Sequence, residues 1–265
     1  MRIGFLQFSP EFGAVKRNLD FIAKRLEGVA ADLVVLPELG NSGYLFVAQK
    51  EVASLAETVP GPTTEFLHEV ARKNDVHLVL GLPERGGDRF YNSAVLVGPS
   101  GLIGSYRKVH LFYEEKRYFQ PGNRGFPVFE FNGVKVGLLV CFDHLFPEAA
   151  RALALQGAQL ICHPSNLVLP TKAQLSTRVR AMENRLFWVL CNRFGTEDRG
   201  DKRLTYTGES QVVDPDGQVL VGAPQAGEAL SVVEIDPAQA LDKHVTRLND
   251  LFEDRRPQVY QALLG

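Results

Sequence analysis

The sequence predicts an α/β fold made of two similar halves, each with its own sheet and with helices on the outer faces. Two observations carry this prediction. Short apolar runs alternate along the chain with segments whose apolar residues recur at helical spacing. A strand–turn–strand pattern also occurs twice, starting at Ser93 ("SAVLVGPSGLIG") and at Ser210 ("SQVVDPDGQVLVG"), each time after a strand–helix–strand passage.

In the first half, composition and spacing place each element. The segment "ADLVVLPE" is apolar throughout from Leu33 to Pro37, which is typical of a strand covered on both faces. Pro62 stands near the start of a helix, where its missing N–H costs no hydrogen bond. The expected elements are, in order, a strand over 2–8, a helix over 18–29, a strand over 31–38, a helix over 61–75, a strand over 76–84 and a hairpin over 91–108.

The second half repeats this order with different residues. Gly157 is well placed to cap the helix that begins at Pro147. The expected elements are, in order, a strand within 134–143, a helix over 147–157, a strand over 158–165, a helix around 171–185, a strand over 186–195 and the hairpin from Ser210. No Gly/Ser-rich or charged linker separates the halves, so we expect one domain over 1–265. Its polar end, 240–265, is expected to pack as a tail on its own core or on another subunit.

The composition excludes several classes of protein. The 265 residues carry a formal net charge of −2 with a pI near 6.3, which leaves no electrostatic footprint for nucleic acid or acidic membranes. No segment approaches the roughly 18 apolar residues of a membrane span, and the first residues do not form a secretory signal. Three cysteines do not make a disulfide framework. We therefore expect a reduced, cytoplasmic protein without nucleic-acid or membrane partners.

Three reactive side chains follow the ends of predicted strands. Glu38 follows "LVVLP", Cys141 follows "VGLLV", and Lys108 closes the first hairpin. Open α/β sheets bind ligands at the carboxyl ends of their strands, so sheet-on-sheet packing of the halves would bring the three together. A carboxylate can take the proton of a thiol during attack, and an ammonium can stabilise the negative oxygen of a tetrahedral intermediate. This set predicts covalent acyl transfer through a thioester.

Structural interpretations of the same residues stay open at this point. A cysteine that ends an apolar run is more often a core residue than a nucleophile, and Cys162 and Cys191 keep that interpretation. Glu38 and Lys108, each taken alone, are ordinary solvated residues.

Metal and cofactor sites are not predicted. His110, His144, His163 and Asp143 lie near the motifs but form no recognised ligand spacing. Gly-rich phosphate loops and a Gly-x-Ser-x-Gly elbow are absent from the sequence as well. We therefore expect neither a metal nor a cofactor.

Three segments, in this order, resemble the signature motifs of the nitrilase superfamily of carbon–nitrogen hydrolases: "LVVLPELGNSGY", "YRKVHLF" and "LLVCFDHLFPEAAR". Flanking segments such as "YEEKRYFQPGN", "HPSNLVLP" and "RAMENRLFWVLCNR" extend the resemblance over nearly the whole chain. The resemblance implies a four-layer αββα sandwich. It also implies a homodimer or higher homo-oligomer in which the C-terminal segment crosses to the partner.

The resemblance implies a role for each motif residue of a cofactor-free enzyme. Cys141 would be the nucleophile, Glu38 the general base and Lys108 the stabiliser of the oxyanion. Glu115, seven residues after Lys108, matches a second glutamate that helps to position the substrate. The backbone N–H of Phe142 would complete the oxyanion hole. Asp143 and Arg151 are expected to be structural, because an acid and a base eight positions apart could brace the turn that presents Cys141.

The expected substrate is a small linear amide or a ureido (N-carbamoyl) compound. Members of the family that hydrolyse nitriles usually carry Cys-Trp-Glu at the nucleophile, whereas this chain carries Cys-Phe-Asp, which is closer to amidases and carbamoylases. The substrate-binding candidates combine aromatic surface with hydrogen-bond donors, and they are Tyr44, Tyr113, Phe142, His144 and Asn166. His144 has no assigned role. Nitrile hydrolysis, amide or acyl transfer to another acceptor, and a catalytically silent binding module are the alternatives.

Overall fold

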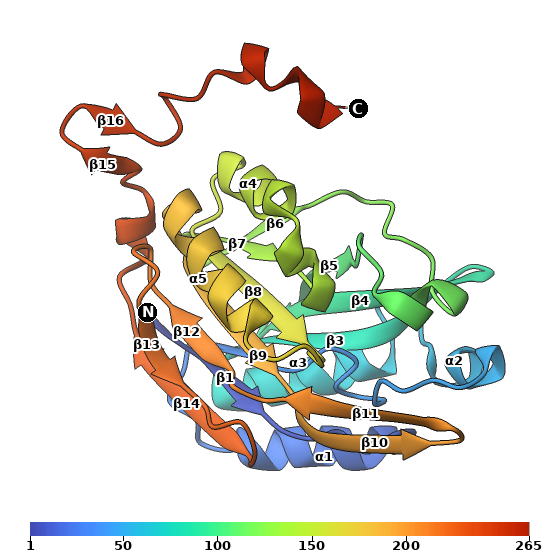
Figure 1. Ribbon diagram of the computed structural model, residues 1–265. Helices are drawn as coiled ribbons and strands as arrows, with labels where there is room; N and C mark the ends of the chain where they lie inside the picture. The colour runs from blue at the N-terminus through green and yellow to red at the C-terminus, as the bar shows by residue number, and fades with distance from the viewer. Residues whose placement is uncertain (265) are drawn as a thin grey trace.

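The computed structural model describes residues 1–264 of the chain (Figure 1). The α-helices of this part are α1 (Val15–Arg25), α2 (Gln49–Leu55), α3 (Pro62–Asn74), α4 (Pro147–Leu155) and α5 (Lys172–Asn184). The strands of the first half are β1 (Arg2–Gln7), β2 (Leu33–Val35), β3 (His77–Gly86), β4 (Arg89–Gly98) and β5 (Gly101–Arg107). Those that follow are β6 (Val128–Phe131), β7 (Val134–Leu138), β8 (Leu160–Ser165), β9 (Phe187–Asn192), β10 (Phe194–Arg199), β11 (Lys202–Thr207), β12 (Gln211–Val213), β13 (Val219–Gly222), β14 (Ala229–Glu234), β15 (His244–Thr246) and β16 (Asn249–Asp250).

Two six-stranded sheets within residues 1–264 share one topology. The first has the strand order β14-β1-β2-β3-β4-β5 and the second has the order β6-β7-β8-β9-β12-β13. In each sheet three neighbouring strands are parallel, β1 to β3 or β7 to β9, and an antiparallel hairpin follows them. Both hairpins lie where the repeated sequence pattern predicts them, so the two similar halves are confirmed.

The sheets pack face to face with helices on both outer sides (Figure 1). Val34 of β2 joins a cluster with residues of α1 and α3, whereas its neighbours Leu33 and Val35 belong to the core between the sheets. That core also includes inner residues of the second sheet and the buried faces of α4 and α5. Because successive strand residues point to opposite faces, one strand serves two layers. The resulting order is helix, sheet, sheet, helix, which confirms the expected αββα sandwich.

Two strands end earlier than the sequence predicts, and both ends carry candidate residues. β2 stops at Val35, because Pro37 cannot donate to the strand ladder. β7 stops at Leu138, and Cys141 begins a short 3-10 turn, η2 (Cys141–Leu145). Glu38 and Cys141 therefore each stand three positions beyond a strand rather than in it.

Other boundaries also differ from the prediction. The first helix begins at Val15 and ends at Arg25, so it precedes the expected range of 18–29 by about one turn. The strand expected over 186–195 ends at Asn192, and the chain turns at Arg193 into a separate two-stranded sheet of β10 and β11. This β10–β11 hairpin was not predicted from the sequence.

The C-terminal segment leaves the sandwich after a 3-10 turn, η3 (Pro237–Ala240), and runs outside it (Figure 1). It contains the short antiparallel pair β15 and β16. The apolar side chains of Val245, Leu248 and Leu263 are 61%, 80% and 66% exposed. Such exposed apolar groups on an extended segment are typical of a surface that another chain covers.

Three further observations concern the described part of the chain. No helix within residues 1–264 combines the length and the apolar character that a membrane span needs. In the same range, no group of three or more His, Cys, Asp or Glu side chains is arranged to hold a metal ion. Each of the three cysteines is buried and outside any disulfide in this range.

Candidate active site

A buried lysine lies between two carboxylates where the strand ends of the first half meet. Lys108 Nζ donates to Glu38 Oε1 at 2.8 Å and to Glu115 Oε1 at 2.7 Å. Lys108 follows β5 directly, Glu38 follows β2, and Glu115 lies on the 3-10 turn η1 (Tyr113–Arg117). The Lys108 and Glu38 side chains are fully buried, so their charges interact with little screening by solvent. The structure thus brings together three of the predicted residues.

Glu38 is held on one side and open on the other. Asn92 Nδ2 donates to Oε1 at 2.7 Å, and Asn166 Nδ2 donates to the backbone carbonyl of Glu38 at 2.8 Å. The second oxygen, Oε2, has no hydrogen-bond partner among residues 1–264. Burial raises the pKa of Glu38 to about 7, although Lys108 and Asn92 favour the charged form. A carboxylate with this pKa can both accept and return a proton near neutral pH.

Glu115 joins the lysine to the predicted residue Tyr44. The Tyr44 hydroxyl donates to Glu115 Oε1 at 2.7 Å, and the Phe112 backbone N–H donates to Oε2 at 3.2 Å. Burial and the Glu115 charge raise the pKa of Tyr44 well above its usual value, so it stays a neutral donor. Burial opposes the charge of Lys108, but the surrounding negative groups hold its pKa well above the usual range. Lys108 is therefore a fixed cation.

Cys141 occupies a strained backbone position at the start of η2. Its φ of 45° lies in the left-handed region, which a non-glycine residue adopts only when its surroundings impose it. Asp143 provides part of that restraint, since its Oδ2 accepts from the Val140 N–H at 2.9 Å and from the Tyr106 hydroxyl at 2.8 Å. The His110 N–H donates to Oδ1 of the same carboxylate at 3.1 Å. The turn is thus held by a buried acid.

The expectation that Arg151 braces the turn of Cys141 together with Asp143 is wrong for Arg151. Arg151 Nη2 instead donates to the Glu183 carbonyl at the end of α5, at 2.6 Å. Its guanidinium also stacks over Phe252 of the C-terminal segment, 5.1 Å from the ring centre. Arg151 therefore joins α4 to α5 and to the tail, while Asp143 is bound by Val140, by Tyr106 of β5 and by His110 of the loop after β5.

The thiol of Cys141 is in a neutral resting state. Burial raises its pKa well above the usual value, the Glu38 charge acts in the same direction, and Lys108 acts in the opposite one. The carbonyl of Cys141 lies 2.8 Å from His163 Nε2. Burial lowers the pKa of His163 to about 3, so this ring is neutral and donates a hydrogen bond without adding charge. An attack by this thiol requires simultaneous removal of its proton.

Comparison with known proteins decides the family. Residues 5–242 match the family model described as carbon–nitrogen hydrolase.

The chain belongs to the carbon–nitrogen hydrolase family.

Within this nitrilase superfamily, the chain is 44% identical over 264 residues to a protein of Pyrococcus abyssi named nitrilase, covering 98% of this chain and 99% of that one. It is 39% identical over 260 residues to an (R)-stereoselective amidase of Pseudomonas sp., covering 97% and 92%.

A solved structure of a Glu-to-Gln variant of the Nesterenkonia sp. amidase matches with a TM-score of 0.82 and 30% identity, covering 99% of both chains. It shows acrylamide added to the active-site cysteine. This carbon–nitrogen hydrolase is therefore an enzyme of the nitrilase superfamily, as predicted. Its relatives act on different substrates, so the family alone does not identify the substrate of this chain.

A small pocket surrounds Cys141 in this hydrolase. Its volume is about 20 Å³, and the substrate-binding candidates Phe142, His144 and Asn166 lie on its wall. His144 Nδ1 lies 2.6 Å from Ser176 Oγ of α5, and burial lowers the pKa of His144 to about 4. His144 is therefore a neutral wall residue whose ring is oriented by Ser176.

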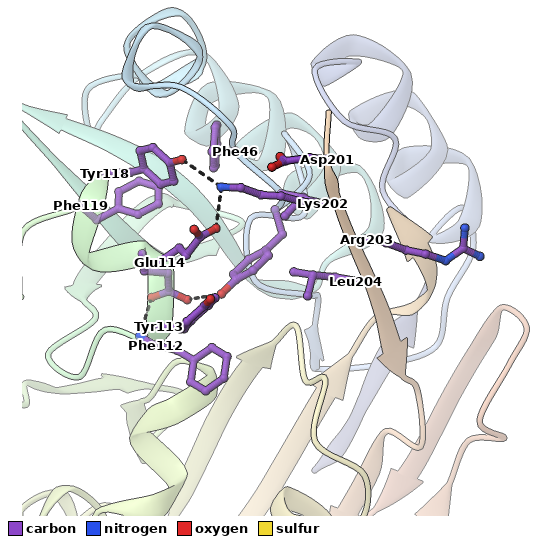
Figure 2. A pocket seen from close by; sticks show the side chains of 13 residues that line it. Phe46, Phe112, Tyr113, Glu114, Tyr118, Phe119, Asp201, Lys202, Arg203 and Leu204 are labelled. Atoms are coloured by element: carbon purple, nitrogen blue, oxygen red, sulfur yellow. Dashed lines mark hydrogen bonds and ion pairs between the residues drawn. The ribbon is translucent and has the colours of Figure 1, made fainter. Parts of the chain in front are cut away.

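A larger chamber of about 370 Å³ lies beside this pocket, between η1 and the β10–β11 hairpin (Figure 2). Tyr44 and Glu115 line it, and Phe112 lines both spaces. The candidate Tyr113 is 75% exposed and lies at its rim, with a φ of 45°. The structure thus separates the predicted substrate residues: three lie at the thiol, and the two tyrosines lie on the chamber.

Three contributors to the site were missed from the sequence. Asn92, in "FYNSAV", is a polar residue inside an apolar strand, and that signal could have marked it. His163, in "ICHPS", gives the same signal but was considered only as a metal ligand. Lys202, which lines the chamber from the tip of the β10–β11 hairpin, has no such signal, because a lysine in a polar turn is ordinary.

Proposed function

We propose that this hydrolase cleaves the C–N bond of a small linear amide or N-carbamoyl compound through a thioester on Cys141. The observation that carries the proposal is the fully buried Lys108, which lies 2.8 Å from Glu38 and 2.7 Å from Glu115. The charges of all three groups act on the thiol of Cys141, at the start of its strained turn. The acrylamide adduct on the active-site cysteine of the Nesterenkonia amidase supports the same chemistry.

In the first step, Cys141 Sγ attacks the carbonyl carbon while its proton passes to Glu38. The proton transfer accompanies the attack because burial keeps the thiol neutral, and Glu38 with a pKa of about 7 is a suitable acceptor. The open Oε2 of Glu38 supports this role, since no partner within residues 1–264 competes for it. The Lys108 ammonium and the Phe142 N–H would stabilise the oxyanion.

In the second step, the C–N bond breaks and Glu38 returns the proton to the leaving nitrogen, which departs as ammonia or an amine. Water then adds to the thioester, with Glu38 taking one of its protons. The C–S bond breaks, Glu38 returns that proton to Cys141 Sγ, and the acid is released. Glu115 holds Lys108 in place throughout by a charge-assisted hydrogen bond.

Nitrile hydrolysis is a second candidate, because the Pyrococcus abyssi relative with 44% identity carries the name nitrilase. The same thiol can add to a nitrile carbon, and Glu38 can supply the proton that the nitrogen then needs. Transfer of the acyl group would differ only in the nucleophile that attacks the thioester, which would be another acceptor instead of water. A silent binding module would show no turnover at all.

Ammonia release from butyramide, butyronitrile and N-carbamoyl compounds, with hydroxylamine as a competing acceptor, separates these possibilities. Cys141→Ala should lower the rate by at least about 10⁴-fold with the fold retained. Cys162→Ala is the matched control, because Cys162 is an equally buried thiol on β8. A poor substrate should leave an acyl adduct on Cys141 by mass spectrometry. An adduct on Cys162 or Cys191, or full activity of Cys141→Ala, would contradict the proposal.

We also propose that the chain forms one domain over 1–265 and that its tail, 240–265, packs on a second copy in a homodimer or larger homo-oligomer. The exposed Leu248 and Val245 support this assembly, because a partner surface would bury them. Light scattering of Leu248→Asp tests this assembly, and an unchanged mass would contradict it.

We propose a cytoplasmic location for the enzyme. The three cysteines, which lie outside any disulfide within residues 1–264, support it.

A further inference from the structure

The pocket at Cys141 is too small for a whole substrate. Its volume of about 20 Å³ holds about one water molecule, which is room for the reacting carbonyl group but not for a chain attached to it. The chamber of about 370 Å³ has the size of a small-ligand site, and Phe112 lines both spaces. The remainder of a substrate therefore has room beyond Phe112.

The chamber has aromatic walls and a charged far end (Figure 2). Its rings come from Tyr44, Phe46 and Phe119, and such walls suit a short run of methylene groups. Figure 2 shows Lys202 reaching from β11 toward Glu114, and its Nζ lies 2.6 Å from Glu114 Oε2. The two side chains are only 22% and 20% exposed. A ligand in the chamber would meet this pair rather than bulk water.

We propose that Lys202 binds a carboxylate at the far end of the substrate, so that the preferred substrates are small amides or ureido compounds with one anionic end. The inference rests on the proposed function of the same site. Glu114 has a second cation, since Arg117 Nη1 lies 2.9 Å from its Oε1. The Lys202 ammonium has three N–H groups, of which two face Glu114 and the Tyr118 hydroxyl, the latter at 3.4 Å. The third N–H suits one carboxylate.

The β10–β11 hairpin is held in place by contacts other than those of Lys202. Arg199 binds Glu51 through both terminal nitrogens, at 2.8 Å and 3.1 Å, and donates to the Leu45 carbonyl at 2.8 Å. Glu197 accepts from the Leu45 N–H at 2.8 Å on the same side. Replacing Lys202 should therefore leave the hairpin in place, although it removes the contacts of Lys202 with Glu114 and Tyr118 together with any contact to ligand.

Binding is measured first, because it does not depend on turnover. Cys141→Ala protein is titrated calorimetrically with glutaramic acid, pentanamide and δ-aminovaleramide, which differ mainly in the charge of the far end. We expect glutaramic acid to bind most tightly, and Lys202→Met to raise its Kd about 10- to 100-fold while changing that of pentanamide less than about twofold. Lys116→Met is the matched control, since Lys116 lies on η1 but lines a different surface pocket, and it should change neither.

Lys202→Glu gives a second test of the same idea. It should reverse the preference toward δ-aminovaleramide, whereas a structural clasp would weaken all three ligands alike. The inference is overturned by such a uniform loss, by absence of glutaramic acid binding, or by a preference of the parent protein for either other ligand. Turnover of the same compounds with Cys141 intact tests the proposed function separately. Glutaramic acid that binds through Lys202 but is never cleaved would contradict the proposed function and leave this subsite standing.

Discussion

The two halves of the molecule have the same strand order but contribute different things to the site. The first half supplies the joined ionisable groups, Glu38, Lys108 and Glu115. The second half supplies Cys141, on a strained turn that Asp143 and backbone hydrogen bonds restrain. In the proposed mechanism, one half therefore sets the protonation of the site, and the other sets the geometry of the attacking thiol.

Equivalent positions in the two halves make the difference concrete. β5 is followed by Lys108, whereas the equivalent strand β13 ends in Gly222 and is followed by an alanine. β2 leads to Glu38, whereas the equivalent strand β8 leads to Asn166, whose side chain donates to the Glu38 carbonyl. A shared scaffold thus places a charged group in one half and a neutral hydrogen-bond donor opposite it.

Among variants of the first half, Lys108→Met should have the largest effect on activity. Loss of the cation should lower kcat/KM by at least about 10²–10³-fold, because an oxyanion donor is removed. Since Lys108 lowers the pKa of Glu38, the acid limb of the pH profile should also move above pH 7. Ammonia release measured across pH tests both effects, with circular dichroism to verify folding.

Lys135→Met is the matched control for that variant, because Lys135 is an exposed lysine of the second half on β7. Its kcat/KM should stay within about twofold of the parent. If Lys108→Met kept the parent rate and pH profile, the first half would not set the protonation of the site.

The sequence predicted the candidate catalytic residues because they follow strand ends, and strand ends follow from apolar runs. Glu38, Lys108 and Cys141 each come directly after such a run or hairpin, the first two in one sheet and the third in the other, so the packing of the two sheets brings them together. The two halves were predictable for the same reason, since each repeats a strand–helix–strand passage and a Pro-x-Gly turn.

The parts that could not be predicted depend on contacts between segments distant in sequence. Asp143 and Arg151 were expected to brace one turn together, but the partners of Asp143 include Tyr106 and His110, which lie more than 30 positions away in the sequence. Lys202 lines the chamber only because the β10–β11 hairpin folds over η1. No local periodicity encodes such contacts, because they depend on where two separate turns meet.

A smaller effect is expected where the second half supports the first. Glu197 on β10 accepts from the Tyr44 N–H at 3.2 Å and from the Tyr206 hydroxyl at 2.6 Å, and Tyr44 in turn donates to Glu115. Glu197→Gln should therefore lower kcat about 10-fold, since a small misplacement of a positioning group costs up to about 10²-fold. In a Tyr44→Phe background, Glu197→Gln should lower kcat less than about twofold, because the hydrogen bond from Tyr44 to Glu115 is already absent.

This pair of variants is read as a double-mutant cycle. Thermal unfolding is measured alongside, because Glu197→Gln also leaves the buried Arg193 without its carboxylate partner, 2.7 Å away. A loss of rate of the same size with and without Tyr44→Phe would show that Glu197 acts on folding alone. The second half would then not support the charged groups of the first through this residue.

The smallest effect is expected for Asn92→Leu, which tests the protonation of Glu38 by itself. Glu38 must be a carboxylate to accept the thiol proton, so kcat/KM should fall as the pH drops through about 7. Asn92 stabilises the charged form, and its loss should move this acid limb upward by about one pH unit, with the rate at pH ~9 nearly unchanged. Asn192→Leu makes the same change in β9, where Asn192 binds the Leu167 N–H. Asn192→Leu should lower Tm and leave the pH of the acid limb unchanged. An equal shift of the acid limb in both variants would show that the protonation of the site is not set by the first half alone.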